Sequence, residues 1–445
     1  MKNNIKLISK YMMAGSVVLT SLLSCSIDEI ADPNGPSVDV VSNAATKTQL
    51  DELAVGLESS IRNGLGVEVT ASGIMARELY LFDADPRNTG DLLGKNGIQL
   101  DNNSFYSTAQ WNGNYRAIKN ANVLIEAISN TDAVDVTEKN GYLGFAKTMI
   151  SYELIQILKS YHQARVDVSD PDNLGPLLEI SAGFDYVIQL LNEANTDLNA
   201  AGTEFVFPLS TGFSGFDTPS TFLEFNRALV AVASVYNGNG QDALDALDDS
   251  FFNLSGALET GPKHVFGLGG NDQANPVFRA PSESAAEPNN GDQIIVHDSW
   301  INDAEAGDTR VANKTAVRPD PSIQDDLSGA YETRLYASST SPVDLVRNEE
   351  LILVYAEANI LTTNFVEAAN ALSVIRNSAG LSDYTGALTQ SALTDELLRQ
   401  RRYSLWSENH RMFDMWRYGR SQTLPKDRSG DVIYSSFPIP LSENL

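Results

Sequence analysis

The sequence predicts a mainly α-helical protein, built of irregular helical hairpins with loop-rich insertions and a little β structure. Apolar residues recur at three- and four-residue steps along most of the chain after Ala44, as they do where one face of a helix packs on a core. Several of these helical segments are separated by only a few polar residues, which favours helical hairpins. By contrast, residues 253–342 are rich in Gly, Asn, Pro and Ser and contain only brief strand-like pieces, such as residues 294–296.

The first element is a secretory signal peptide, predicted over residues 1–24. Lys2, Lys6 and Lys10 precede an apolar run over residues 11–23, which is the charge and hydropathy pattern of an export signal. The run is shorter than the roughly 20 apolar residues that a transmembrane helix needs. We therefore expect this segment to be removed on export.

Cys25 is the predicted lipidation site. Residues 22–25 read LLSC, which resembles the lipobox of bacterial lipoproteins, where a small residue precedes a cysteine that receives diacylglycerol. Cys25 is also the only cysteine of the chain, so it has no disulfide partner. The alternative is a free cysteine behind an ordinary cleaved signal. We expect acyl chains such as palmitate on Cys25 to anchor the mature protein, with residues 25–42 as a linker and residues 43–445 as a single domain.

The helices of that domain follow from their apolar stripes. The first stripe consists of Leu50, Leu53, Ala54, Leu57, Ile61 and Leu65. A polar loop is expected over residues 81–110, and further helices are predicted over residues 111–125, 142–161, 184–198, 222–236, 243–247, 351–361 and 365–377. Gly380 is the expected C-cap of the last one. Paired helices of this kind build tetratricopeptide (TPR) arrays. The strict repeat of about 34 residues is absent, so the hairpins are TPR-like and irregular.

Composition excludes some classes of partner. The chain has 445 residues and a formal net charge of -27, with 42% hydrophobic and 20% charged residues, as in an ordinary globular protein. Such an acidic surface repels phosphates, so we expect no nucleic-acid partner.

No catalytic or metal-binding motif is apparent. The sequence GFSGF at residues 212–216 departs from the nucleophile-elbow motif at its fifth position, where glycine is required. The histidines are His162, His264, His297 and His410, and no two have metal-ligand spacing. We expect a protein that is not an enzyme, with no catalytic residues, no metal site and no cofactor.

Several blocks of sequence resemble the SusD/RagB family, in the family's order along the chain. They are WNGNY at residues 111–115, FNRALVA at 225–231, GDTR at 307–310, VRNEELILVYAEAN at 346–359, IRNSAGL at 375–381, RRYSLWSENHRMFDMWR at 401–417 and FPIP at 437–440 with Glu443. The match departs from the family pattern at Ser404, where the family usually has an acid.

The resemblance implies a SusD-like fold, with a loop-rich ligand region at about 253–342 and a C-terminal helical signature at 343–420. It implies a surface-exposed outer-membrane lipoprotein that faces the cell exterior and binds a nutrient, most simply an oligosaccharide. The protein would deliver this ligand to a SusC/RagA-like TonB-dependent transporter. Two alternatives stay open, namely RagB-like capture of an oligopeptide and a TPR-like scaffold for envelope proteins. A surface hydrolase with an unrecognised carboxylate pair is a third, and the sequence names no particular glycan.

Sugar capture requires flat aromatic faces beside polar groups that bond hydroxyls. The candidates are loop aromatics and their polar neighbours: Tyr80, Phe82, Asp83, Asp85, Arg87, Phe213, Phe216 and Trp300. Aromatic residues usually bury on folding, so packing is the competing interpretation for each aromatic side chain. For Trp111, Tyr115, Trp406 and Trp416 we predict packing in the core.

The arginine-rich C-terminal block has two interpretations. Charged side chains recur there at three- and six-residue steps, close to one helical face, at Arg402, Glu408, Arg411, Asp414 and Arg417. One interpretation is a catalytic or anion site, and the other is a buried network that fixes packed elements. We predict the network.

Overall fold

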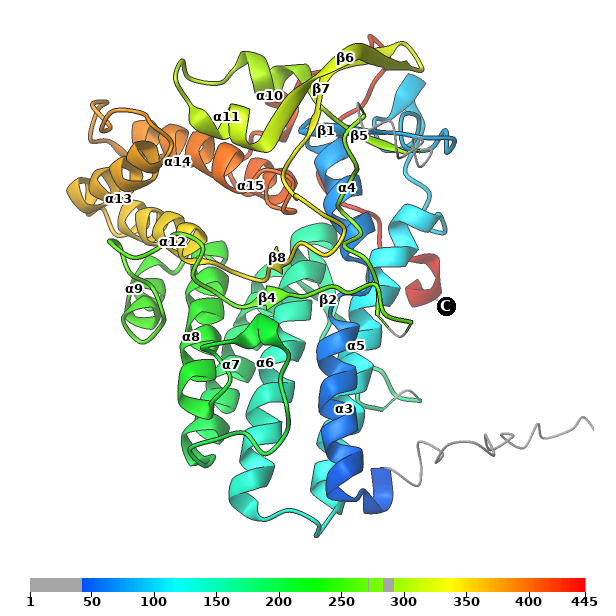
Figure 1. Ribbon diagram of the computed structural model, residues 1–445, viewed down its shortest axis with the longest axis vertical. Coiled ribbons are helices and arrows are strands. Elements are labelled where there is room, and N and C mark those ends of the chain that lie inside the picture. The colour runs from blue at the N-terminus through cyan, green and yellow to red at the C-terminus, as the bar shows by residue number, and fades with distance from the viewer. Residues whose placement is uncertain (1–41, 171, 271, 283–291, 445) are drawn as a thin grey trace, which may run out of the picture.

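The computed structural model describes residues 42–170, 172–270, 272–282 and 292–444 (Figure 1). The expected signal peptide, Cys25 and nearly all of the linker lie outside the described residues. Within these ranges, no helix has both the length and the apolar character needed to cross a bilayer.

The helical body consists of α3 (Lys47–Ser60), α4 (Leu65–Met75), α5 (Phe105–Asn130), α6 (Val136–Tyr161), α7 (Ile180–Ala200), α8 (Pro219–Tyr236) and α9 (Gly240–Asp248). Most of these helices occupy the lower part of Figure 1, α4 lies above them beside β1, and from α4 onward each helix contacts the next one along the chain. Capping boxes start three of them: Thr46 with Gln49 at α3, Asp135 with Glu138 at α6, and Thr218 with Thr221 at α8. The TPR-like helical fold is therefore confirmed.

The first apolar stripe is divided between two helices. It runs over residues 50–65, whereas α3 ends at Ser60 and α4 begins at Leu65. Gly64 adopts a left-handed conformation with φ of 83°, which a side chain would disfavour. The apolar residues of both helices still face the core, because an apolar stripe predicts which residues are buried and does not predict that the helix is continuous.

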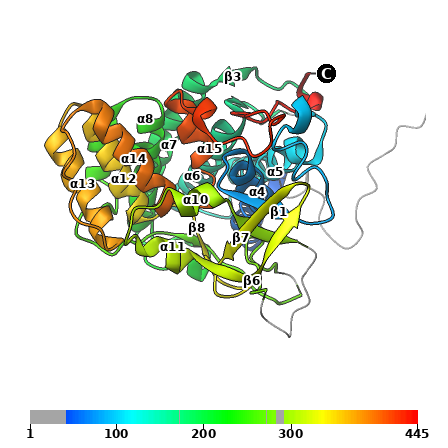
Figure 2. The same ribbon diagram turned by 90° about the horizontal axis from the view of Figure 1, so that it is seen from above.

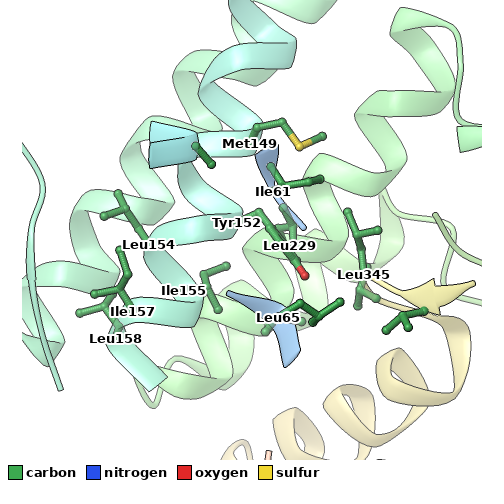
Figure 3. Packing of buried hydrophobic residues seen from close by; sticks show 14 of the residues in the cluster. Ile61, Leu65, Met149, Tyr152, Leu154, Ile155, Ile157, Leu158, Leu229 and Leu345 are labelled. Carbon is green, nitrogen blue, oxygen red and sulfur yellow. The ribbon is translucent and has the colours of Figure 1, made fainter. Parts of the chain in front are cut away.

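The core lies where α3, α4, α6 and α8 meet. Figure 3 shows Ile61 and Leu65 packing beside Met149, Tyr152 and other side chains of α6, with Leu229 of α8 and Leu345 close by. Each fully buried side chain of this size contributes about 1.5–3 kcal/mol relative to an exposed one. The predicted core residues Trp111 and Trp406 are buried as well, while Tyr115 and Trp416 are partly buried against the same cluster.

The C-terminal helices pack beside this body. They are α10 (Asp298–Asn302), α11 (Thr309–Lys314), α12 (Asn348–Leu361), α13 (Phe365–Ser378), α14 (Gln390–Ser404) and α15 (Arg411–Arg417). Helices α12 and α13 form the predicted hairpin. Gly380 follows α13 in a left-handed conformation with φ of 77°, as expected for its C-terminal cap.

Strands cover the upper end of the molecule in Figure 1. A four-stranded antiparallel sheet has the order β1 (Leu79–Phe82), β5 (Gln293–Val296), β7 (Leu327–Thr333) and β6 (Thr315–Gln324). In its register Tyr80 pairs with Ile295, and Val317 pairs with Tyr331. Two short pairs are β2 (Gln163–Arg165) with β3 (Leu177–Glu179), and β4 (Lys263–His264) with β8 (Val343–Asp344).

The β6–β7 hairpin corrects the expectation of only brief strands in residues 253–342. Strand β6 spans ten residues although it contains Pro319 and Pro321. Proline is tolerated there because β6 is an edge strand and the pairing shifts register between Val317 and Ser322.

Four of the five charged residues of the arginine-rich block join ion pairs as predicted, although the block does not lie on one helical face. They are Arg402, Glu408, Asp414 and Arg417, whereas Arg411 has no carboxylate partner among the described residues. The residues of the block occupy the end of α14, a turn and α15, and helix α15 begins at Arg411. Asp414 accepts hydrogen bonds from Arg401 Nε at 2.7 Å and Arg417 Nη2 at 2.9 Å. Arg417 also pairs with Glu357 of α12. The network therefore ties α12, α14 and α15 together.

Candidate functional site

A loop of residues 83–104 joins β1 to α5 and forms the candidate surface. The hairpin tip between β6 and β7 holds it: Gln324 Nε2 donates to the Asp83 carbonyl at 2.7 Å, and Lys95 pairs with Asp325. Arg428 also bonds Asp325, with 2.7 Å between Nη1 and Oδ2. These bonds hold the loop against the sheet, so the positions of its side chains are defined.

Two carboxylates organise the start of the loop. Asp83 Oδ1 accepts from the backbone N–H of Asp85 and from Asn88 Nδ2, both at 2.7 Å. The Asp85 carboxylate accepts from Arg87 Nε at 2.9 Å and Arg87 Nη2 at 2.6 Å, a two-pronged ion pair. These hydrogen bonds from Arg87 hold the pKa of Asp85 below its ordinary value.

Phe105 stands beside this ion pair at the first position of α5. Its side chain is 48% exposed, and it is the one aromatic residue among the large hydrophobic side chains that are exposed in the described ranges. The Arg87 guanidinium lies 5.8 Å from the Phe105 ring centroid and 5.5 Å from that of Tyr106. The two rings meet edge to face at 5.3 Å.

We call Asp83, Asp85, Arg87, Phe105 and Tyr106 the Phe105 surface. It offers an exposed apolar ring beside a planar cation and carboxylates that are held in place by hydrogen bonds. An aromatic face can pack on the C–H side of a sugar ring, while carboxylates and guanidiniums bond its hydroxyls. This arrangement can bind a polar, uncharged ligand without any covalent chemistry.

The structure brings Tyr80 and Phe82 together and buries both of them, as it does Trp300. Tyr80 and Phe82 lie in β1, where their rings stack at 5.3 Å, and Tyr80 contacts the ring of His297 at the start of α10. Trp300 is 0% exposed and packs between Tyr403 and Trp406. These side chains are therefore not the exposed loop aromatics that the sequence suggested. Tyr80 and Phe82 are buried in the paired strand β1, and Trp300 is buried against α14 and the turn after it.

Phe213 and Phe216 lie on different elements from the Phe105 surface and are also buried. Phe213 lies in η2 (Thr211–Phe213) and packs on Phe222, while Phe216 packs on Phe251. Phe213 lines a groove of about 640 Å³ beside α3. The polar groups of this groove already bond within the protein, as Glu58 does with Ser210 and Arg62 with Asp272.

Neither His297 nor His264 has a catalytic arrangement. The Nδ1 atom of His297 accepts from the backbone N–H of Ser299 at 3.0 Å, so Nε2 carries the proton toward Asp427 at 2.8 Å. Both ring nitrogens are thus occupied, and neither can serve as a general base for a serine. Burial lowers the pKa of His264 to about 3, which keeps it neutral. In the ranges that the structure describes, no three His, Cys, Asp or Glu side chains are placed to hold a metal ion.

Phe105 was absent from the sequence-based candidates. Its position inside the expected loop over residues 81–110 could have indicated an exposed aromatic residue. However, Phe105 lies just before the predicted helix whose aromatic residues Trp111 and Tyr115 were assigned to the core. Only the start of α5 at Phe105 reveals that its ring faces outward from the first helical turn.

Comparisons with known proteins agree with this fold. Residues 328–444 match the model of the SusD family, whereas a comparison with curated proteins finds no match. Among solved structures, surface glycan-binding protein A from Bacteroides thetaiotaomicron in complex with laminarihexaose is similar with a TM-score of 0.67 at 14% identity, over 90% of this chain and 97% of that one. A SusD superfamily protein from Parabacteroides distasonis gives a TM-score of 0.65 at 19% identity, over 88% and 96%. One from Bacteroides vulgatus gives 0.64 at 16%, over 89% and 96%.

Proposed function

Because this chain belongs to the SusD/RagB family, we propose that it captures an oligosaccharide at the Phe105 surface and delivers it to a SusC-like TonB-dependent transporter. The observation that carries this proposal is the exposed ring of Phe105 beside the Arg87–Asp85 ion pair. Exposure of an aromatic ring to water is unfavourable, and the ring would be removed from water when the apolar face of a sugar binds to it.

Two further observations support an uncharged glycan as the ligand. A structure with the same fold is a complex with laminarihexaose, an oligosaccharide. In addition, the Arg87 charge is neutralised by Asp85, so the surface has no free cation to attract an anion. Capture needs no chemical step, which agrees with the hydrogen bonds that occupy both ring nitrogens of His297.

The proposal places the protein at the outer face of the outer membrane. Cys25 would carry the lipid anchor, and residues 25–42 would let the folded part reach the mouth of the transporter. The acidic surface would limit nonspecific adhesion to anionic lipid headgroups. Protease treatment of intact cells should therefore degrade the protein, and one large barrel should copurify with it.

Isothermal titration of the purified protein against oligosaccharides of different linkage, laminarihexaose included, and against oligopeptides tests the ligand class. We expect heat with one glycan class. Phe105→Ala should weaken that binding about tenfold or more, because an anchoring aromatic side chain contributes more than about 1 kcal/mol. Phe105→Trp, which keeps a flat ring, should retain it.

Leu388→Ala is the matched control, since Leu388 is 49% exposed and lies in the loop before α14. Its affinity should equal that of the unmodified protein. Glycan binding that survives Phe105→Ala would move the site elsewhere, with the groove beside α3 as the next candidate. Binding of peptides without glycans would overturn the glycan assignment.

A further inference from the structure

A pocket rich in arginine lies between α14, α15 and the turn that follows α10. These helices lie close together in Figure 2, and Trp300 of α10 donates to the Arg402 carbonyl of α14 at 3.3 Å. The pocket has a volume of about 430 Å³, within the range of ligand sites. Its charged lining residues are Arg399, Arg402, Arg411, Arg420, Asp303 and Asp395.

The excess of cations here contrasts with the rest of the molecule. Four arginines and two aspartates line the pocket, in a chain whose net charge is -27. Asp395, Arg399 and Arg402 lie at steps of four and three along α14, so they share one face of that helix. The pocket is therefore a local positive site on an acidic protein.

The four arginines differ in how fully they are bonded. Arg402 is satisfied, because it donates to Glu78 at 3.1 Å, Asp303 at 2.9 Å and Ser299 at 2.9 Å. The Arg399 side chain is 51% exposed, and its closest carboxylate among the described residues lies 3.9 Å away. Arg420 has one pair at the surface, at 2.5 Å to Asp395. Arg399 and Arg420 therefore retain free donors.

Arg411 is the least satisfied of the four. Its guanidinium makes one long hydrogen bond, 3.4 Å from Nη1 to the Leu398 carbonyl, and its Nε is buried without a partner. Among the described residues no carboxylate oxygen lies within 4.0 Å of it. Burial lowers the pKa of Arg411, and the charge of Glu78 offsets this only in part. An anion in the pocket would supply the missing acceptor.

We propose that this pocket binds an oxyanion, the carboxylate or sulfate group of an acidic molecule about as large as a monosaccharide. Guanidinium groups bind such planar or tetrahedral oxyanions through two parallel N–H bonds. Arg399 and Arg420 contact the anion from the open side, and Arg411 contacts it from the floor. This site lies on other elements than the Phe105 surface and does not depend on the function proposed for that surface.

The test is titration of the purified protein with sodium sulfate, sodium glucuronate and neutral glucose, at constant ionic strength set with sodium chloride. We expect sulfate and glucuronate to bind and to raise the unfolding temperature, and glucose and chloride to have no effect. The double variant Arg399→Gln/Arg420→Gln should lose affinity about tenfold or more, because charge-assisted hydrogen bonds are removed. Arg411 is left in place because its replacement would also disturb the buried Glu78.

Arg116→Gln is the control for a change of charge alone, since Arg116 is exposed on α5. It should bind both anions as the unmodified protein does. Tighter binding of glucuronate than of sulfate would identify a carboxylated sugar as the ligand class, and the reverse order would identify a sulfate group. The proposal is overturned if neither anion binds, or if the double variant binds both with unchanged affinity.

Discussion

Replacing Asp414 by asparagine is expected to lower the free energy of unfolding by about 3–5 kcal/mol. Asp414 is 2% exposed and accepts hydrogen bonds from Arg401 and Arg417. Burial opposes its ionisation, but the charges of these two arginines outweigh burial and hold the pKa of Asp414 below its ordinary value. The carboxylate is therefore charged at neutral pH, and asparagine removes that charge while keeping the volume.

The magnitude follows from what the substitution leaves behind. The Arg401 side chain is 0% exposed, and Asp414 is its one carboxylate partner within 4.0 Å among the described residues. Its other contacts are with Tyr236 at 3.2 Å and His410 at 3.4 Å, neither of which carries a negative charge. Without Asp414, the buried Arg401 guanidinium would have no negative partner. Leaving a buried charge unpaired in this way lowers the free energy of unfolding more than losing an ion pair at the surface does. Arg417 is affected less, because Glu357 still pairs with it.

Thermal unfolding followed by circular dichroism provides the assay. For a chain of 445 residues, an unfolding entropy of about 2 cal/mol/K per residue converts the expected loss into a fall of about 3–5 °C in Tm. Asp248→Asn is the control, since Asp248 is exposed at the end of α9, and it should change the unfolding free energy by less than about 0.5 kcal/mol. Equal Tm values for the two variants would refute the argument, because the network would then contribute no more than a surface charge.

Two further predictions concern single positions. Burial raises the pKa of Glu350 to about 7, although the charge of Lys159 opposes the shift. The folded protein therefore keeps a proton on Glu350 that the unfolded chain releases near pH 4.5. As a result, the free energy of unfolding falls as the pH rises from about 4.5 to 7. Glu350→Gln imitates the protonated form, so urea unfolding should show nearly equal stability at pH 4.5 and a gain of about 3 kcal/mol at pH 8. No gain at pH 8 would contradict this. Gly380→Ala should cost about 1 kcal/mol in the same measurement, because φ is 77° and the new Cβ would lie 3.1 Å from Thr309 Cγ2. Gly269→Ala, which meets nothing within 4 Å, should be nearly neutral, and equal losses for the two would contradict the strain argument.

The helical body could be predicted from the sequence because its signals are local. In the α12–α13 hairpin, the apolar stripes, the polar break at residues 362–364 and Gly380 all lie within about one helical turn of the features that they specify. Each of these sequence features indicates burial or a backbone conformation at its own position. The helices can therefore be predicted without knowing which residues they contact across the core.

The β6–β7 hairpin could not be predicted in this way. Strand β6 contains Pro319 and Pro321 with charged neighbours, which is the composition of a loop. Its extended conformation depends on pairing with β7, which in turn pairs with β5 far away in the sequence. Sheet pairing of this kind is a tertiary effect and overrides local propensity.

The same limit applies to the site. Trp300 and Phe105 both stand among polar residues, so sequence patterns cannot say which ring is exposed. Contacts with Tyr403 and Trp406, about 100 positions later, bury Trp300, whereas nothing comparable covers Phe105. Asp83, Asp85 and Arg87 could be nominated because they cluster in the loop sequence itself. Their contact with a ligand stays a prediction.

Charge distribution links the two proposed sites. Buried arginines such as Arg401 and Arg417 are matched by buried carboxylates, so these pairs add nothing to the net charge of -27. The excess carboxylates must therefore lie mainly at the surface, which as a whole repels anions. A neutral glycan can approach the Phe105 surface regardless of the negative surface charge. An acidic ligand is attracted only where cations outnumber carboxylates, as they do in the pocket lined by Arg399 and Arg420. Raising the salt concentration should accordingly leave glycan affinity nearly unchanged and alter anion affinity, because only the second depends on screened charges.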